Sequence, residues 1–190
     1  MPLFFWGDAD GSRYRDSYFD TWPGVWRHGD WMQLIDRRAQ GGAVGAVIYG
    51  RSDATINRHG LRLGTAEIYR AIEAVPEVVD SLSVDLEYLG KRSALLLFVV
   101  LRPGAVLDAE LDARLRDAVR RELSPRFVPD EIHAVAAVPR TLTGKKLELP
   151  LRRLLLGQPA EVALPRDTVA NPECLDAFIE FARQRAAASD

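Results

Sequence analysis

The apolar positions in the second half of the chain follow the two periods that distinguish strands from helices. Every second position from Leu82 to Tyr88 is apolar and the positions between are polar, which predicts a half-buried strand. Residues 94–101, "ALLLFVVL", are apolar throughout, as is typical of a central strand covered on both faces. The segment "YLGKR" predicts a hairpin between these strands, and a third strand is expected over residues 131–138.

Four helices are expected around these strands. Thr65 stands where an N-cap should, before a short apolar stripe. Over residues 108–123 apolar residues recur every four positions with charged residues between them, which predicts an amphipathic helix capped by Asp108. Shorter helices are predicted over residues 151–156 and 172–185. This order of elements indicates an α+β fold, with a small mixed or antiparallel sheet of about three strands covered by helices.

The first 50 residues have a different pattern. Aromatic residues crowd among glycines and turn signals, with little helical periodicity, so we expect short strands without a core of their own. These strands are predicted over residues 25–27, 31–36 and 46–49. We place a boundary near Gly50, which divides the chain into residues 1–50 and 51–190.

Composition and charge argue against several classes of protein. The 190 residues carry a net charge of −2 and are 47% hydrophobic, which indicates neither disorder nor a broad nucleic-acid surface. One cysteine, Cys174, and three scattered histidines supply neither a disulfide framework nor a zinc site of recognisable spacing. The longest apolar run is far shorter than the roughly 20 residues that span a bilayer, and the N-terminus lacks a signal-peptide layout. We therefore expect a cytoplasmic protein with no membrane and no nucleic-acid partner.

Two adjacent lysines, Lys145 and Lys146, are the first candidates for chemistry. They follow Gly144, which suggests a phosphate-binding P-loop. That motif requires a glycine five positions before Gly144, where Pro139 stands, and a serine or threonine in place of Lys146. The P-loop match therefore fails. Taken alone, a solvated lysine on a turn is the simpler interpretation.

Three motifs in a fixed order give this turn a chemical context: "HGDW" at 28–31, "GRSDATINRHGLRLGTAEIY" at 50–69 and "PRTLTGKK" at 139–146. Together they resemble the C-terminal third of adenylate-forming acyl-CoA synthetases, and the resemblance covers nearly all of the chain. Within that superfamily, "YFDTWPGVWRHGDW", "GRSDATINRHG", "LSPRFVPDEI" and "GKKLELPLRRLLLGQP" are most similar to acetoacetyl-CoA synthetases.

The resemblance implies a ligase that converts acetoacetate, ATP and CoA to acetoacetyl-CoA, AMP and diphosphate. Residues 1–50 would then be the β-rich tail of a large N-terminal adenylation domain, and residues 51–190 the mobile C-terminal lid domain. ATP, CoA and a small carboxylic acid are the implied ligands, with Mg²⁺ bound mainly through the large domain.

The catalytic lysine of the family motif P-x-T-x-[ST]-G-K corresponds to Lys145. In adenylation a carboxylate attacks the α-phosphorus of ATP, and a lysine between these two anions orients them and offsets their charge. In the family the domain then rotates for the second half-reaction, in which the thiol of CoA attacks the acyl-adenylate, so the turn is expected to be mobile. Lys146 is given no role and is expected to be solvated.

Other site residues follow from the same resemblance. Asp30 corresponds to the aspartate that accepts hydrogen bonds from the ribose hydroxyls, and Arg51 and Arg62 to arginines that contact the nucleotide. Asp53 corresponds to the hinge about which the small domain swings. Without the family, a turn aspartate and solvated arginines would be the ordinary interpretation of these residues.

The CoA face is assigned in the same way. Gly60 and its neighbours would face the pantetheine arm, and Arg120 or Arg121 would contact a phosphate of CoA. An exposed helix arginine is the alternative.

The phosphate loop, the adenine pocket and the acyl pocket of the family have no counterpart in this sequence. We therefore expect a piece of a longer enzyme that is inactive alone. The alternatives are a stand-alone interaction module that binds a separate large subunit, a domain without catalytic function, and a fragment of an acetyl- or propionyl-type CoA synthetase.

Overall fold

The structure is a computed structural model that describes residues 2–51, 56–58, 61–86 and 93–188. The chain forms two compact units, Met1–Asp53 and Ala54–Asp190, which are described separately here. The sequence placed the boundary between residues 50 and 51.

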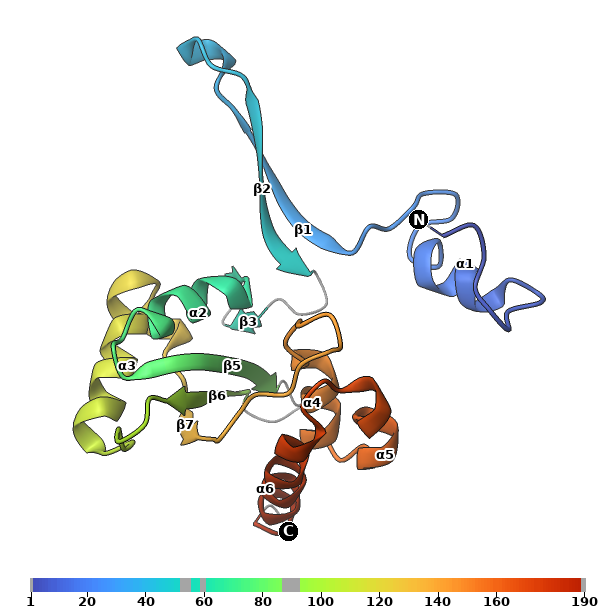
Figure 1. The fold of residues 1–190 in the computed structure, drawn as a ribbon. Coiled ribbons are helices and arrows are strands. Elements are labelled where there is room, and N and C mark those ends of the chain that lie inside the picture. The colour runs from blue at the N-terminus through green and yellow to red at the C-terminus, as the bar shows by residue number, and fades with distance from the viewer. Residues whose placement is uncertain (1, 52–55, 59–60, 87–92, 189–190) are drawn as a thin grey trace. The chain divides into compact units, whose positions relative to one another are not determined.

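The first unit contains a helix that the sequence pattern missed. Its elements are α1 Ser12–Tyr18, β1 Asp30–Asp36, η1 Arg38–Gln40 and β2 Val44–Arg51 (Figure 1). The carboxylate of Asp8 accepts the amide hydrogens of Arg13 and Tyr14 at 3.0 and 2.8 Å, which satisfies two of the free N–H groups at the start of α1. A strand expected over residues 25–27 is absent, whereas the two other expected strands form the antiparallel pair β1–β2.

No residue of the first unit whose burial is described is buried. The β1–β2 hairpin exposes five large apolar side chains: Met32, Leu34, Val44, Val47 and Ile48. This agrees with the expectation that these strands have no core of their own.

The second unit is built around a three-stranded mixed sheet, as predicted. Its strands are β5 Val78–Leu86, β6 Ala94–Leu101 and β7 Glu131–Ala134, in the order β5-β6-β7. The β5–β6 pair is antiparallel and the β6–β7 pair is parallel. The remaining strands are the antiparallel pair β3 Ile56–Arg58 and β4 Leu61–Leu63.

Helices cover both faces of this sheet (Figure 1). α2 Thr65–Glu73 and α3 Ala109–Glu122 pack on one face, and α4 Glu148–Leu155 and α6 Leu175–Ala187 pack on the other. The shorter helical turns are η2 Pro125–Phe127, α5 Ala160–Ala163, η3 Arg166–Thr168 and η4 Pro172–Cys174.

β6 separates two apolar clusters, as expected of a central strand. Leu95, Leu97 and Val99 face the cluster formed with α2 and α3. Leu96 and Phe98 face the cluster formed with α4 and α6. The alternate side chains of one strand therefore hold both helical layers on the sheet.

The expected half-burial of β5 is wrong. Ser81 and Ser83, which the pattern placed on a solvent face, are fully covered and form hydrogen bonds with side chains of α2. The register of β5 also shifts between Val78 and Asp80, which changes the face to which the following side chains point. The alternation of polar and apolar residues in β5 therefore distinguishes the two faces of the strand. It does not show that the face with Ser81 and Ser83 is exposed to solvent.

Two predicted helix starts have different outcomes. Asp108 caps α3, because its carboxylate accepts the amide hydrogen of Leu111 at 2.8 Å. Thr65 does not cap α2, since Gly64 occupies the N-cap position and Thr65 is the first helical residue.

The third strand is shorter than expected and ends at Ala134. The segment "YLGKR" lies outside the described residues.

Within the described part of the chain, no helix combines the length and the apolar character needed to cross a bilayer.

Candidate functional site

Residues 140–146 form a turn that its own backbone closes, and we call it the Lys145 turn. The amide of Thr141 donates to the carbonyl of Lys145 and that of Gly144 donates to the carbonyl of Thr141, both at 2.8 Å. The hydroxyl of Thr141 accepts the amide hydrogen of Lys145 at 3.0 Å. Gly144 has a φ of +84°, a conformation that disfavours residues with a Cβ. The threonines and the glycine of the motif therefore shape the turn.

Lys145 is exposed on this turn. None of the described residues accepts a hydrogen bond from its ammonium group or forms an ion pair with it. An unpaired ammonium group on a short, hydrogen-bonded turn is suited to bind an anionic ligand.

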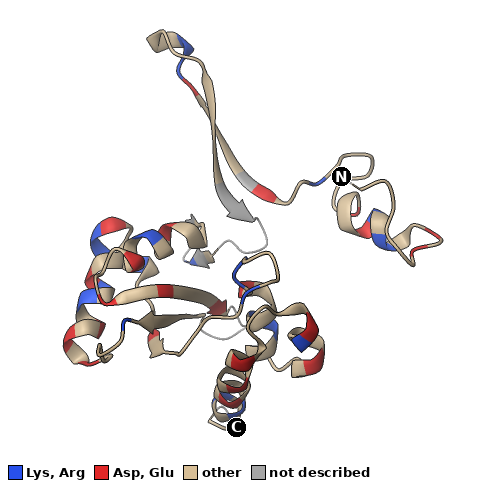
Figure 2. Ribbon diagram, in the orientation of Figure 1, with Lys and Arg blue, Asp and Glu red and all other residues tan. Residues whose placement is uncertain are grey.

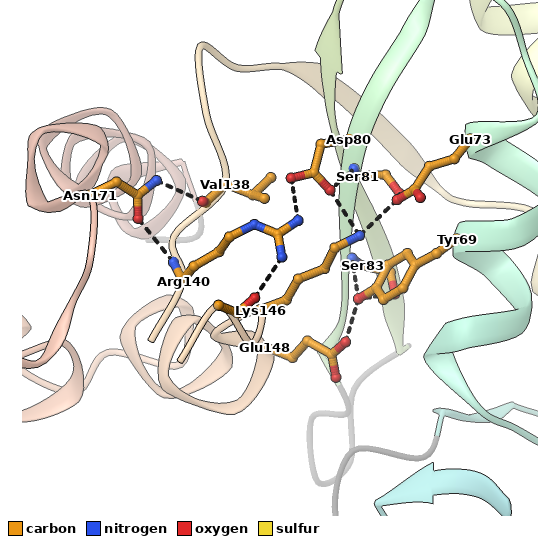
Figure 3. Close-up of polar contacts among 11 residues, drawn as sticks. Tyr69, Glu73, Asp80, Ser81, Ser83, Val138, Arg140, Lys146, Glu148 and Asn171 are labelled. Atoms are coloured by element: carbon orange, nitrogen blue, oxygen red, sulfur yellow. Dashed lines mark hydrogen bonds and ion pairs between the residues drawn. The ribbon is translucent and has the colours of Figure 1, made fainter. Parts of the chain in front are cut away.

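Lys146 is not solvated, so that expectation is wrong. Its ammonium lies 2.7 Å from Oε1 of Glu73 and 3.0 Å from Oδ1 of Asp80 (Figure 3). The same nitrogen lies 3.7 Å from the centroid of the Tyr69 ring, at the distance of a cation–π contact. Only 14% of its side-chain surface is exposed to solvent. The side chain of Lys146 points into the domain because α2 and β5 place the carboxylates of Glu73 and Asp80 and the ring of Tyr69 there.

Arg140, at the other end of the turn, binds the same aspartate. Its Nη2 lies 2.5 Å from Oδ2 of Asp80, and its Nη1 donates to the carbonyl of Gly144 at 2.7 Å. Asn171 holds the backbone next to it, accepting the Arg140 amide hydrogen at 3.0 Å and donating to the carbonyl of Val138 at 2.9 Å. Both ends of the turn are thus bound to the body of the domain (Figure 3).

We call Tyr69, Glu73, Asp80, Arg140 and Lys146 the Lys146 cluster. Burial would raise the pKa of Asp80, but hydrogen bonds from Arg140 and Lys146 outweigh it and hold the pKa below its usual value. Burial, together with the neighbouring carboxylate of Glu148, raises the pKa of Tyr69, whose hydroxyl lies 2.5 Å from Glu148 Oε1. The carboxylate of Asp80 is therefore charged and the phenol of Tyr69 is neutral at neutral pH.

Two of the expected nucleotide residues lie opposite each other in the first unit. Asp30 and Arg51 are cross-strand partners at one end of the β1–β2 pair. The carboxylate of Asp30 also lies 2.8 Å from Nδ1 of His28. Lys145 belongs to the second unit, and so does Arg62, whose backbone pairs with that of Asn57 between β3 and β4.

The expected CoA residues are only partly described. Arg120 is exposed in the last turn of α3 and pairs with Asp117, on a helix where both signs of charge alternate (Figure 2). Arg121 lines a surface groove with Val75 and Arg114. Asp53 and Gly60 lie outside the described residues.

Among the described residues, no three or more histidine, cysteine, aspartate or glutamate side chains form a group that could hold a metal ion. The one cysteine, Cys174, is free and buried, and burial raises its pKa to about 11.

Comparison with known families decides what kind of domain holds the turn. Residues 67–145, from α2 to Lys145, match the family of the AMP-binding enzyme C-terminal domain. The part of the chain that runs from α2 to Lys145 is therefore similar to the C-terminal domain of AMP-binding enzymes. The match begins just before Tyr69 and ends at Lys145, so it includes Asp80 and all of the Lys145 turn except Lys146.

Relatives that match over most of the chain include acetoacetyl-CoA synthetases. Acetoacetyl-coenzyme A synthetase of Rhizobium meliloti (strain 1021) is 41% identical over 178 residues, which cover 94% of this chain and 26% of that protein. Acetoacetyl-CoA synthetase of Mus musculus is 38% identical over 178 residues, covering 94% of this chain and 25% of that protein. The chain therefore spans about a quarter of the length of these relatives.

A solved structure extends the similarity to the fold. Acetoacetyl-CoA synthetase from Streptomyces lividans matches with a TM-score of 0.85 and 48% sequence identity, over 97% of this chain and 27% of that protein. The α+β fold predicted from the sequence is therefore shared with this solved relative.

The sequence did not indicate five residues of the site: Tyr69, Glu73, Asp80, Arg140 and Glu148. Tyr69 and Glu73 are spaced four apart on a predicted helix, which places them on one face. That spacing was the available signal, but nothing in it indicated the lysine that they would meet.

Proposed function

We propose that this chain is the C-terminal part of an AMP-forming acid–thiol ligase that makes acetoacetyl-CoA from acetoacetate, ATP and CoA. The observation that carries the proposal is the exposed, unpaired Lys145 on a closed turn in an AMP-binding enzyme C-terminal domain. The printed names of the relatives support acetoacetate as the acid.

In this proposal Lys145 acts in the first half-reaction. The acid oxygen attacks the α-phosphorus of ATP, the bond to diphosphate breaks, and acetoacetyl-adenylate forms. An ammonium group placed between the two anions lowers their repulsion and aligns them, which favours the transition state. The thiol of CoA then attacks the acyl carbon and releases AMP, a step that needs no cation at the phosphorus.

Three further residues would bind the nucleotide. Asp30 would accept hydrogen bonds from the ribose hydroxyls, and Arg51 and Arg62 would bind nucleotide oxygens. The pairing of Asp30 with Arg51 across the hairpin supports a joint role. Mg²⁺ would neutralise phosphate charge, bound mainly through a large N-terminal adenylation domain of which residues 1–50 would be the tail.

The remaining assignments belong to the second half-reaction. Asp53 would be the hinge between the large domain and the lid formed by residues 51–190. Gly60 would face the pantetheine arm of CoA, and Arg120 one of its phosphates. Arg120 would have to leave Asp117 to do so, which an exposed ion pair permits at little cost. A cytoplasmic location completes the proposal.

An acid-dependent exchange assay tests the proposed reaction on the full protein that contains this chain. Exchange between labelled diphosphate and ATP should depend on acetoacetate, and acetoacetate should give a kcat/KM at least tenfold above those of acetate and propionate. A preference for acetate or propionate would favour an acetyl- or propionyl-type synthetase. Absence of exchange with every acid would favour an interaction module.

A further inference from the structure

The two adjacent lysines of the turn have opposite surroundings. Lys145 is exposed, whereas Lys146 keeps 14% of its side-chain exposure and contacts Glu73, Asp80 and the ring of Tyr69. Lys146 also forms a β-bridge with Arg140 across the base of the turn. Adjacent side chains next to a β-bridge tend to point to opposite sides, and the exposed Lys145 directly precedes the bridged Lys146. The inward direction of Lys146 therefore sets the outward direction of Lys145.

We infer that Lys146 is a positioning residue for adenylation, which fixes the direction and reach of the Lys145 ammonium through the Lys146 cluster. The inference rests on the proposed function of Lys145. Lys146 itself would touch neither ATP nor the acid.

The sharing of Asp80 supports this inference. Oδ1 of Asp80 lies 3.0 Å from Lys146 and Oδ2 lies 2.5 Å from Arg140, so a single carboxylate binds both ends of the turn. The hydroxyl of Ser81 donates to Glu73 at 2.9 Å and the amide of Ser81 donates to Asp80 at 2.9 Å. The two carboxylates that receive Lys146 are therefore held in place themselves.

Because Lys146 is mostly buried, the cluster favours the conformation of the turn in which the Lys146 side chain points inward. A mostly buried ammonium group is costly unless it is paired, and the described residues offer it this set of acceptors. A rotation of the turn that withdrew Lys146 from Glu73 and Asp80 would separate its ammonium group from both of these carboxylates. The cluster thus resists the same motion that would displace Lys145.

A merely structural role for Lys146 predicts something different. In that case its loss would weaken the whole domain and would slow both half-reactions. A positioning role predicts a loss confined to the step in which Lys145 acts, and no further loss once Lys145 is gone.

The test measures each half-reaction in single-turnover experiments on the full ligase that contains this chain. The variants are Lys146→Met, Lys145→Ala and the double variant, with Arg183→Met as the matched control. Arg183 is a cation on α6 that keeps 76% of its exposure, and its loss should change neither step. Adenylation is followed by diphosphate release, and thiolation by acetoacetyl-CoA formation from added acetoacetyl-adenylate and CoA.

Lys146→Met should slow adenylation about 10- to 100-fold through kcat, with little change in KM, because misplacing a reacting group by about 1 Å costs on this order. Thiolation should change less than twofold, and the double variant should be no slower in adenylation than Lys145→Ala. Equal slowing of both steps would overturn the inference, and so would a full additional loss in the Lys145→Ala background.

Glu73→Gln covers the case in which Lys146→Met does not fold. The glutamine keeps the shape and an acceptor oxygen but removes one of the two charges that bind Lys146. It should give a smaller loss with the same restriction to adenylation, and unchanged adenylation in this variant would overturn the inference. The Lys145→Ala arm tests the proposed function separately, since normal adenylation there would refute the role of Lys145 whatever Lys146 does.

Discussion

Two cations, one from each end of the Lys145 turn, share the carboxylate of Asp80. Arg140 and Lys146 hold the pKa of this group below its usual value in spite of its burial. A group whose pKa is lower in the folded than in the unfolded chain stabilises the fold above its unfolded pKa, and this contribution is lost as the pH falls through the folded pKa. At Asp80 the loss should therefore begin below about pH 4, near the usual value of 3.8.

Asp80→Asn should accordingly destabilise the chain at pH 7 and matter less in acid. An asparagine cannot form charge-assisted hydrogen bonds with both cations, so the free energy of unfolding should fall by on the order of 1–3 kcal/mol at pH 7. The difference from the parent should shrink as the pH falls from about 4, measured by urea unfolding. Asp167→Asn, at an exposed carboxylate, is the control. A difference that stayed constant down to pH 2 would contradict the account.

At the scale of elements, the periodicity of side chains predicted those parts of the fold that depend on local pattern. β6 is apolar at every position and lies centrally, and α3 begins at its aspartate cap. α1 was missed because its start depends on Asp8, outside the helix. The burial of Ser81 and Ser83 was missed because it depends on partners in another element.

The candidate site divides in the same way. The motif around Gly144 predicted an exposed Lys145, and the structure has it exposed. The environment of Lys146 depends on Glu73, 73 positions away in the sequence, and on Asp80 in β5. Such contacts exist only after the sheet has brought distant segments together, so no local spacing could indicate them.

The β1–β2 hairpin should be the part of the chain that proteases remove first. It has no described buried side chain and exposes a row of apolar ones, so little free energy opposes its local opening. Limited proteolysis of the 190-residue chain should cut within the first 53 residues and leave a resistant product that contains β5, β6 and α3. Equal rates of cleavage in both units would contradict this expectation.

At the scale of the whole molecule, the proposed nucleotide residues are divided between two units. Asp30 and Arg51 belong to Met1–Asp53, whereas Lys145 belongs to Ala54–Asp190. In the proposed function, a chain that spans about a quarter of its relatives would supply only part of the ATP site. Under the proposed function, Lys145 would give the second unit a role in adenylation that need not extend to thiolation.

The most direct test of this account is the ratio of the two half-reaction rates in Lys145→Ala of the full ligase. Loss of a charge-stabilising donor should slow adenylation by about 10² to 10³, since such donors act in the transition state. Acetoacetyl-CoA should still form at nearly the parental rate from added acetoacetyl-adenylate and CoA. Equal slowing of both half-reactions would contradict the account and would leave the Lys145 turn a structural role only.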